Sequence, residues 1–264
     1  MKKLGIIGCG NMGGAIARSL VKLGVLEGSE LIVSDRHEEK LAALSAETGA
    51  EVTSSNVAAA EQSEMIMLAV KPQYLGELLD EIKDHVRPEQ TVISIAAGKS
   101  LAFLESYLGS EAKIVRTMPT TAALVGASAS AVAPNANVTD EETAEVLKLF
   151  RGFGTADIIP EASFDAFTAV SSSPAFVFMM IEALTDGAVA SGLPRASAQR
   201  MVEQTVYGSA KLALETGKHP GELKDMVCSP AGTTIEGVNV LEDAGFRAAL
   251  IDAFRAAAEK SASM

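Results

Sequence analysis

The feature that most constrains this chain is a glycine-rich turn, Gly8-Cys9-Gly10-Asn11-Met12-Gly13. The apolar run Leu4–Gly8 leads into it, and Ala15-Ile16-Ala17 opens a helix soon after it. Glycines permit a tight turn and let backbone N–H groups approach a pyrophosphate, whose charge is favoured at a helix N-terminus. A G-x-G-x-x-G pattern alone is weak evidence, but its place between a strand and a helix predicts a dinucleotide-binding loop rather than a bare turn.

Short β-branched runs alternate with amphipathic segments through the first half of the chain. We expect strands at Leu4–Gly8, Leu31–Ser34, Met65–Val70, Thr91–Ile95 and Ile114–Met118. We expect helices at Met12–Leu23, Glu38–Glu47 and Leu75–His85. This alternation predicts a parallel sheet with helices on both faces, and ligands of such sheets bind at the carboxyl ends of the strands.

Two segments at those carboxyl ends are candidates for ribose contacts. The second strand ends Ser34-Asp35-Arg36, where Asp35 suits a ribose 2′-hydroxyl of NAD, while Ser34 and Arg36 suit a 2′-phosphate of NADP. A solvated Asp–Arg pair at a helix start is the simpler alternative. Ala69-Val70-Lys71-Pro72 is explained as a strand–helix junction, but its place beside the glycine loop favours a cofactor contact.

From about Asp140 the pattern becomes helical, with one last strand expected at Thr155–Ile159. The segment Pro174–Ala190 is apolar on nearly every face of a helix. A helical half of roughly a hundred residues has difficulty enclosing such a helix alone. We therefore predict that it lies in a subunit interface, with an internal core helix as the alternative.

The run Cys228–Ile235 combines small, hydroxylated and glycine residues without a strong acid or base. Ser229 is a candidate N-cap and Pro230 suits the first helical position. Gly232, Thr233 and Thr234 would then present N–H groups and hydroxyls at the positive end of a helix, which suits a small carboxylate. An ordinary capped helix explains the same residues equally well.

Composition excludes several classes of function. The 264 residues carry a formal net charge of −12, which repels polyanions, so we expect no nucleic-acid partner. The two cysteines, Cys9 and Cys228, lie far apart, which argues against a disulfide framework or zinc site and fits a reducing cytoplasm. No apolar stretch reaches the roughly twenty residues of a membrane helix. His37, His85 and His219 have no triad or metal-ligand spacing, so we expect no metal and a substrate that needs little acid–base help.

Together, several motifs resemble the pyrroline-5-carboxylate reductase family from end to end. They are Ile7-Gly8-Cys9-Gly10-Asn11-Met12-Gly13, Ala69-Val70-Lys71-Pro72, Ser94-Ile95-Ala96-Ala97-Gly98, Arg116-Thr117-Met118-Pro119, Asp165-Ala166-Phe167-Thr168-Ala169 and Asp225-Met226-Val227-Cys228-Ser229-Pro230-Ala231-Gly232-Thr233-Thr234-Ile235. The last is the most specific. The resemblance implies an α/β fold: a Rossmann-type doubly wound sheet in residues 1–159, followed by an all-α substrate-binding and dimerisation domain in residues 160–264.

The activity implied by this resemblance is the NAD(P)H-dependent reduction of 1-pyrroline-5-carboxylate to L-proline, the last step of proline biosynthesis, in a cytoplasmic homodimer or dimer-based oligomer. A cyclic imine is readily protonated near neutral pH and accepts hydride directly. Positioning and charge complementarity can then supply most of the catalysis, which explains the missing acid.

The resemblance also assigns site residues. Backbone groups at Ser229, Gly232 and Thr233 should hold the substrate carboxylate, and the Thr234 hydroxyl should lie near the ring nitrogen as the catalytic group. Asn56 is expected on the adenosine side, Ala96 and Ala97 near the nicotinamide, and Glu161 near its carboxamide. With the residues found above, the expected cofactor set is Ile7, Gly8, Gly10, Asn11, Met12, Gly13, Ser34, Arg36, Asn56, Ala69, Val70, Lys71, Pro72, Ala96, Ala97 and Glu161. NADP is the expected cofactor, with NAD as the alternative.

Three positions depart from the family pattern. Thr120 follows Met118-Pro119 where an asparagine is usual, Ala231 replaces a glycine, and Ser171-Ser172-Ser173-Pro174 is one residue short. Two other functions remain as alternatives. A β-hydroxyacid dehydrogenase would need a base such as Lys211, Lys218 or Lys224, and a silent dinucleotide sensor would bind the cofactor without turnover.

Overall fold

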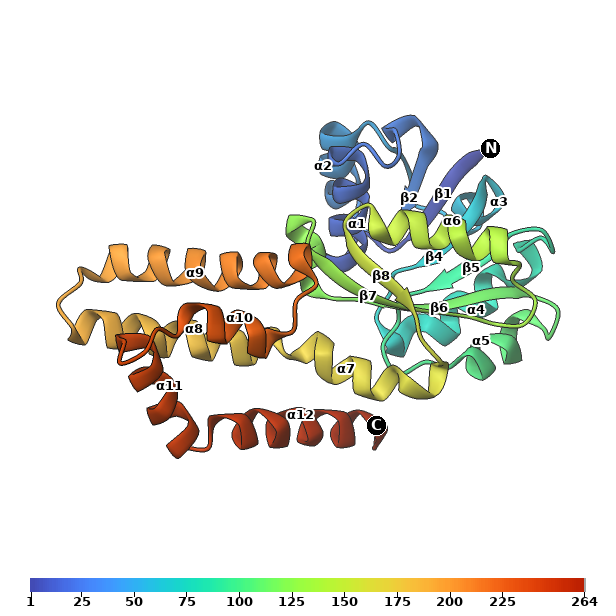
Figure 1. The fold of residues 1–264 in the computed structure, drawn as a ribbon. Coiled ribbons are helices and arrows are strands. Elements are labelled where there is room, and N and C mark those ends of the chain that lie inside the picture. The colour runs from blue at the N-terminus through green and yellow to red at the C-terminus, as the bar shows by residue number, and fades with distance from the viewer. Residues whose placement is uncertain (264) are drawn as a thin grey trace. The chain divides into compact units, whose positions relative to one another are not determined.

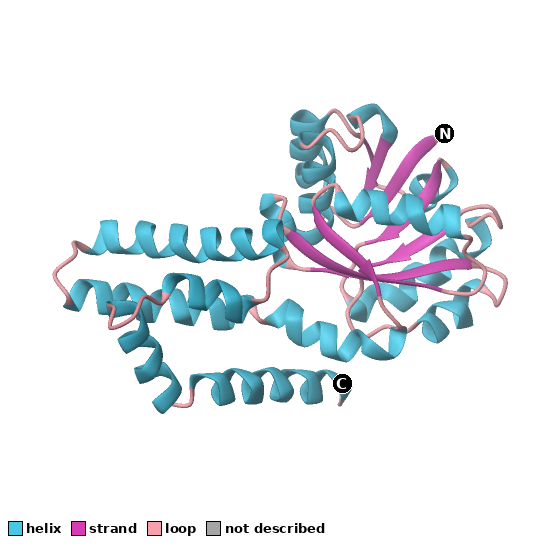
Figure 2. Cartoon of the chain, viewed as in Figure 1, coloured by secondary structure: helices cyan, strands magenta, loops and turns pink. Residues whose placement is uncertain are grey.

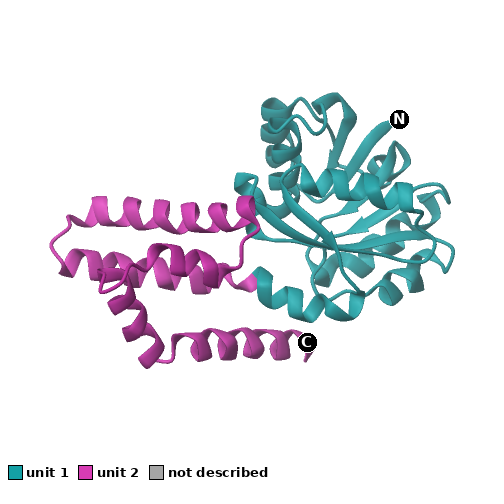
Figure 3. Ribbon diagram, in the orientation of Figure 1, with its two compact units in different colours: residues 1–171, 264 teal, residues 172–263 magenta. Residues whose placement is uncertain are grey.

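The computed structural model describes residues 1–263, which form two compact units, residues 1–171 and residues 172–263 (Figure 3). The first is built around a sheet with strand order β3-β2-β1-β4-β5-β6-β7-β8 (Figure 1). Its strands are β1 Lys2–Ile7, β2 Leu31–Ser34, β3 Glu51–Thr53, β4 Ser63–Leu68, β5 Thr91–Ser94, β6 Lys113–Pro119, β7 Ser128–Pro134 and β8 Gly154–Ile158. Neighbouring strands are parallel except for β6 and β7, which are antiparallel. The predicted doubly wound α/β sheet is confirmed.

Helices flank this sheet (Figure 2). They are α1 Asn11–Lys22, α2 Glu38–Thr48, α3 Asn56–Glu61, α4 Leu75–Ile82, α5 Leu101–Leu108, α6 Asp140–Arg151 and α7 Phe164–Ser172. Short 3₁₀ turns occur at η1 Gly28–Glu30, η2 Pro72–Tyr74, η3 Lys83–His85, η4 Thr121–Val125 and η5 Glu161–Ser163. The sequence pattern did not reveal β3 or β7. The first has only three residues, and the second is rich in serine and alanine, which lack a strand preference.

The first unit has an apolar core on each face of the sheet. Along β4, Met65 and Met67 join the cluster under α1, α2 and α6, whereas Ile66 and Leu68 join the cluster under α3, α4 and α5. Successive side chains of a strand point to opposite faces. A strand buried on both faces therefore reads as a continuous apolar run, which is why β4 was detectable in the sequence.

The second unit is entirely helical. Its helices are α8 Pro174–Ala190, α9 Arg195–Thr216, α10 Pro220–Val227, α11 Thr233–Asp243 and α12 Phe246–Ala262, and α8 packs along α9 (Figure 1). In α8 only Thr185 is buried, while the side chains of Phe178 and Met179 are 67% and 69% exposed. The alternative that this segment is an internal core helix is therefore wrong for the single chain.

The apolar character of this region extends backwards from α8. Contrary to the expectation from the sequence, the helical run Glu161–Ala190 is long and apolar enough, by length and composition alone, to cross a membrane, and only 6% of its apolar window is buried. This is weak evidence, because apolar helices of soluble proteins meet the same criterion. The observation that matters is an apolar surface that the single chain leaves uncovered.

Candidate functional site

The glycine loop between β1 and α1 brings the backbone close to the neighbouring strand end. Gly8 has φ +111°, and a Cβ there would lie 2.7 Å from the carbonyl oxygen of Ala69. A Cβ on Gly13 would collide with the carbonyl oxygen of Gly8. Gly10 is the N-cap residue of α1 and has open space where a Cβ would be. The loop thus requires glycine at two positions, and at the third it leaves room for a ligand at the helix N-terminus.

A pocket of ≈ 460 Å³ lies where β1, β2 and β4 end. From the expected cofactor set it is lined by Ile7, Gly8, Gly10, Arg36, Asn56, Ala69, Val70 and Lys71. The other lining residues are Asp35, His37, Lys40, Tyr74, Glu77, Leu78 and Glu81. The expected residues outside this lining are Asn11, Met12, Gly13, Ser34, Pro72, Ala96, Ala97 and Glu161. The carboxyl ends of the parallel strands therefore form a cavity where the fold class predicts one.

Asp35, at the end of β2, is engaged by the protein itself. One carboxylate oxygen accepts the backbone N–H of Cys9 at 2.7 Å. The other accepts the backbone N–H of His37 at 2.9 Å and lies 2.7 Å from its Nδ1. Burial raises the pKa of Asp35, but hydrogen bonds from His37 and Cys9 outweigh it and hold the pKa below the ordinary value. The carboxylate thereby connects the end of β2 to the glycine loop.

A chain of hydrogen bonds orients Asn56 in the pocket. The buried Ser34 hydroxyl donates to Asn56 Oδ1 at 2.9 Å, and Asn56 Nδ2 donates to Glu81 Oε2 at 2.9 Å. Ser34 therefore uses its hydroxyl on a neighbouring side chain, below the pocket surface. Its predicted contact with a 2′-phosphate stays a prediction, because Ser34 is not among the residues that line the pocket.

The segment after β4 turns directly into a helix. Pro72 stands in the first turn of η2, as expected, and the Tyr74 N–H donates to the carbonyl of Lys71 at 2.9 Å. The ring of Tyr74 lies 5.5 Å from the guanidinium carbon of Arg36, at the other side of the pocket lining.

The residues expected near the nicotinamide follow β5 and β8. Ala96 is buried and Ala97 is exposed. Glu161 accepts the backbone N–H of Leu101 at 2.7 Å and Nη1 of Arg116 at 2.9 Å. The Glu161 carboxylate thus connects the start of α5 to β6. Thr120, which replaces the usual asparagine, is buried, and its hydroxyl accepts the backbone N–H of Ala129 at 3.1 Å.

In the second unit, the loop between α10 and α11 differs from the expected helix start. Helix α11 begins at Thr233 with Gly232 as its N-cap residue, so the prediction of Ser229 as N-cap is wrong. The Gly232 N–H donates to the carbonyl of Ser229 at 3.0 Å, and Ala231 has φ +55°. This left-handed turn delays the helix by three residues. It puts Thr233 and Thr234 in the first turn, where backbone N–H groups have no intrahelical acceptor.

The same turn requires a glycine before the threonines. A Cβ on Gly232 would overlap the hydroxyl oxygen of Ser229. Within residues 1–263 no protein hydrogen bond is seen for the hydroxyls of Ser229, Thr233 or Thr234. The loop therefore presents hydroxyls and N–H groups at the positive end of an eleven-residue helix.

Comparison with known proteins shows which family this chain belongs to. The family "Pyrroline-5-carboxylate reductase dimerisation" matches residues 161–264, and the family "NADP oxidoreductase coenzyme F420-dependent" matches residues 3–98. The pyrroline-5-carboxylate reductase of Escherichia coli strain K12 is 49% identical over 98% of this chain and 97% of its own. That of Methanosarcina acetivorans is 46% identical over the same shares.

This chain belongs to the pyrroline-5-carboxylate reductase family. Solved structures agree. The reductase from Coxiella burnetii has a TM-score of 0.95 and 32% identity, covering 99% of this chain and 98% of that one. The Plasmodium falciparum enzyme, solved with NADP bound, has a TM-score of 0.85 and 33% identity, covering 98% and 97%.

In this family member, sequence reasoning missed several pocket residues that share helical spacing. Tyr74, Leu78 and Glu81 recur at i, i+4 and i+7, and Glu77 lies beside them. His37 and Lys40 lie one turn apart at the start of α2. Helical spacing after a strand end was the available signal, because residues at i, i+4 and i+7 lie on one face of a helix, and this face of α4 borders the pocket.

A β-hydroxyacid dehydrogenase would need a positioned base, and the three candidate lysines are not arranged as one. Lys218 and Lys224 form ion pairs of 2.6 Å with Glu222 and Asp225, and Lys211 lies 3.6 Å from Glu215. Lys211 and Lys218 are exposed to solvent and Lys224 is partly exposed, and Lys218 lies in the loop between α9 and α10. Among residues 1–263, no group of three histidines, cysteines or acids is arranged to hold a metal ion.

Proposed function

We propose that this chain is an NAD(P)H-dependent pyrroline-5-carboxylate reductase, an oxidoreductase that reduces 1-pyrroline-5-carboxylate to L-proline. The observation that carries the proposal is full-length similarity to reductases of that name, at up to 49% identity, combined with retention of the Ser229–Thr234 loop. The product makes this the final step of proline biosynthesis.

NADP is the proposed cofactor. A relative that is 33% identical was solved with NADP bound, and the residues here fit a dinucleotide. Gly8 and Gly13 let the loop approach a pyrophosphate, with N–H groups of Asn11 and Met12 at the start of α1. Asp35 is already hydrogen-bonded to Cys9 and His37. It is therefore a poor acceptor for a 2′-hydroxyl, which favours NADP over NAD.

The pocket lining includes the acidic residues Asp35, Glu77 and Glu81, and we propose that two cationic side chains in the same lining meet the 2′-phosphate. Arg36 and Lys40 both line the pocket, and neither forms an ion pair within residues 1–263. Ser34 and Asn56 support the adenosine side through their shared hydrogen bond. Ala69, Val70, Lys71 and Pro72 follow β4 at the ribose side. Ala96, Ala97 and Glu161 are proposed at the nicotinamide side by family resemblance.

For the substrate, we assign the carboxylate to the N-terminus of α11. The N–H groups of Thr233 and Thr234 and the Ser229 hydroxyl are available there, while the Gly232 N–H bonds to Ser229 in this structure. Gly232 then acts by giving the loop room. When bound, the nicotinamide would supply a hydride to the carbon of the protonated imine, and the proton on the ring nitrogen would remain there as the amine N–H. The Thr234 hydroxyl orients that nitrogen or donates its proton.

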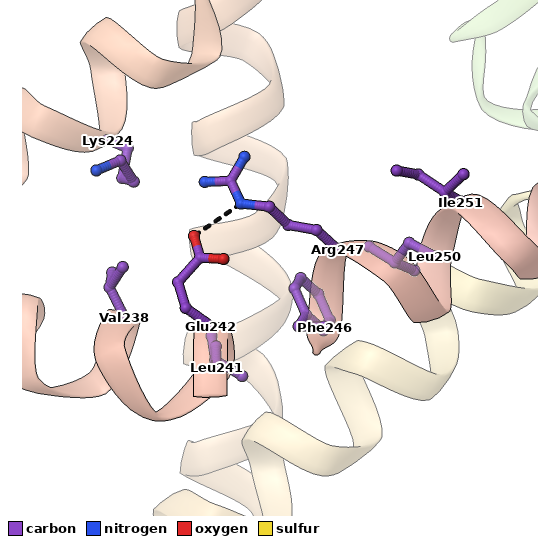
Figure 4. Close-up of a pocket in the computed structure, with 8 residues that line it drawn as sticks. All are labelled: Lys224, Val238, Leu241, Glu242, Phe246, Arg247, Leu250 and Ile251. Carbon is purple, nitrogen blue, oxygen red and sulfur yellow. Dashed lines mark hydrogen bonds and ion pairs between the residues drawn. The ribbon is translucent and has the colours of Figure 1, made fainter. Parts of the chain in front are cut away.

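The functional division is proposed at residues 1–159 for dinucleotide binding and 160–264 for substrate binding and dimerisation. The second unit supports a homodimer. In addition to the exposed faces of α8 and α9, this unit has an apolar groove (Figure 4). The groove is lined by Val238, Leu241, Phe246, Leu250 and Ile251, and the Glu242–Arg247 ion pair lies at its side. A second copy would bury these surfaces, and we propose that the dimer works in the cytoplasm.

The experiment that tests the function measures oxidation of NADPH, and separately of NADH, by the purified chain with 1-pyrroline-5-carboxylate, together with the yield of L-proline. Thr234→Val should lower kcat by about 10²-fold while leaving the Kd for NADPH unchanged. Thr155→Val, at an exposed position of β8 in the first unit, is the matched control. Cofactor binding without proline formation would contradict the proposal and favour a dinucleotide sensor.

A further inference from the structure

A cation–π contact spans the dinucleotide pocket. The guanidinium carbon of Arg36, just after β2, lies 5.5 Å from the ring centroid of Tyr74, just after β4. This is within the roughly 6 Å over which a ring face attracts a cation. Both residues line the same pocket, and both belong to the first unit.

Arg36 has little else to hold it. Its side chain is exposed, and within residues 1–263 no ion pair or hydrogen bond fixes its guanidinium. Arg18 and Arg116, in contrast, are each paired with a glutamate. The neighbouring Asp35 carboxylate is occupied by Cys9 and His37. The N–H donors of Arg36 therefore remain available for a ligand.

Tyr74 is the more rigid member of the pair. Its N–H donates to the carbonyl of Lys71 at 2.9 Å, and Pro72 restricts the backbone of the same turn. The turn continues into α4, which is anchored by the buried Leu75 and Leu78. Tyr74 is 43% exposed on this anchored backbone. Tyr74 thus provides a fixed surface against which a flexible arginine can rest.

We propose that Tyr74 is a positioning residue for cofactor selectivity: it holds the Arg36 guanidinium where its donors meet the 2′-phosphate of NADPH. This inference rests on the proposed NADP-dependent function. An arginine that is pre-organised loses less conformational freedom when the phosphate binds. NADH has no such phosphate, so its binding should not depend on the contact. A direct stacking of Tyr74 on adenine would instead affect both dinucleotides alike.

The test is a double-mutant cycle on the full chain, with Kd values for NADPH and NADH from fluorescence titration. Tyr74→Leu should raise the Kd for NADPH about two- to five-fold, the effect expected of an exposed cation–π contact, and leave that for NADH unchanged. Tyr74→Phe, which keeps the ring, should behave like wild type. In an Arg36→Ala background, Tyr74→Leu should have no further effect on NADPH binding. Gln73→Leu, in the same turn, is the matched control.

Steady-state kinetics provide a second readout. Tyr74→Leu should raise the KM for NADPH and leave kcat at saturating NADPH unchanged. Equal losses for NADPH and NADH, or a full effect of Tyr74→Leu without Arg36, would overturn the positioning role while leaving the reductase function intact. Failure of the wild-type chain to bind either dinucleotide would overturn the proposed function and this inference together.

Discussion

The two units of this reductase family member differ in how completely they bury their own apolar residues. In residues 1–171 the central strands are enclosed on both faces, with Ile6, Ile66 and Ile93 at 0% exposure. In residues 172–263 only Thr185 and Ala198 are buried. A chain that leaves contiguous apolar helix faces in water is using them to bind something. The first unit therefore completes its core alone, whereas the second requires a partner, which we propose is a second copy.

The ligand loops of the two units differ in the same way. The glycine loop is bonded to its surroundings through Asp35 and the end of β4. The loop after α10 shows no protein partner for its three hydroxyls within residues 1–263. One loop is supported from within the chain, and we propose that the substrate provides the missing partners of the other.

The largest expected effect is on self-association, when an exposed leucine of the second unit is replaced by a charged residue. Leu184 and Leu23 are 49% and 50% exposed in the single chain, but Leu184 lies on α8 and Leu23 ends α1 in the first unit. Leu184→Glu should weaken self-association by 100-fold or more, since it places a charge in an apolar interface, at about 3 kcal/mol or more. Sedimentation velocity over a concentration series measures this.

The matched variant Leu23→Glu should leave self-association unchanged. If both variants weaken self-association equally, or if neither does, then Leu184 is no more buried in the assembly than Leu23. The proposed interface along α8 is then wrong.

The core of the first unit should respond differently. Ile66→Ala removes a side chain from the centre of β4, where it is 0% exposed. We expect the free energy of unfolding to fall by about 2–5 kcal/mol, through lost burial and a residual cavity. Chemical denaturation measures this, and sedimentation should find the association constant unchanged. Dissociation of the folded Ile66→Ala protein would contradict the separation of roles between the units.

Sequence patterns revealed those elements of the first unit that are continuous and apolar, and missed those that depend on neighbours. Strand β4 was detectable because both its faces are buried, but β7 was not, because alternating Ser128, Ala129 and Ser130 become a strand only by pairing with β6 and β8. The antiparallel β6–β7 pair could not be inferred from strand–helix alternation either.

The site follows the same rule. Gly8 and Arg36, which both line the pocket, could be predicted because their chemistry is local to a motif. Tyr74 was missed because its contact joins two loops that are distant in sequence. The start of α11 was misjudged because Ser229-Pro230 is a normal helix opening, and a left-handed Ala231 cannot be anticipated from propensity.

A smaller effect concerns stability in acid, and it tests the support that Asp35 gives to the glycine loop. Because hydrogen bonds from His37 and Cys9 outweigh burial and lower the pKa of Asp35, its ionised form stabilises the folded state above the unfolded pKa of about 3.9. That contribution is lost as the pH falls through the lower, folded value. Asp35→Asn should therefore be less stable than wild type at pH 7, with the difference disappearing in acid. A difference in Tm that stays constant from pH 7 to pH 2.5 would contradict this.

The smallest expected effect lies in the loop before α11, where Ala231 has φ +55°. An L-residue is strained in this left-handed region and glycine is not, so Ala231→Gly should raise the free energy of unfolding by about 0.5–1 kcal/mol. Ala256→Gly, on α12, is the matched control and should lower it by about 1 kcal/mol, because glycine is unfavourable inside a helix. Opposite signs in urea denaturation would establish that the strain is local to the turn. If Ala231→Gly loses stability as Ala256→Gly does, Ala231 is not strained in the native turn. The loop before α11 would then be as well supported as the glycine loop of the first unit.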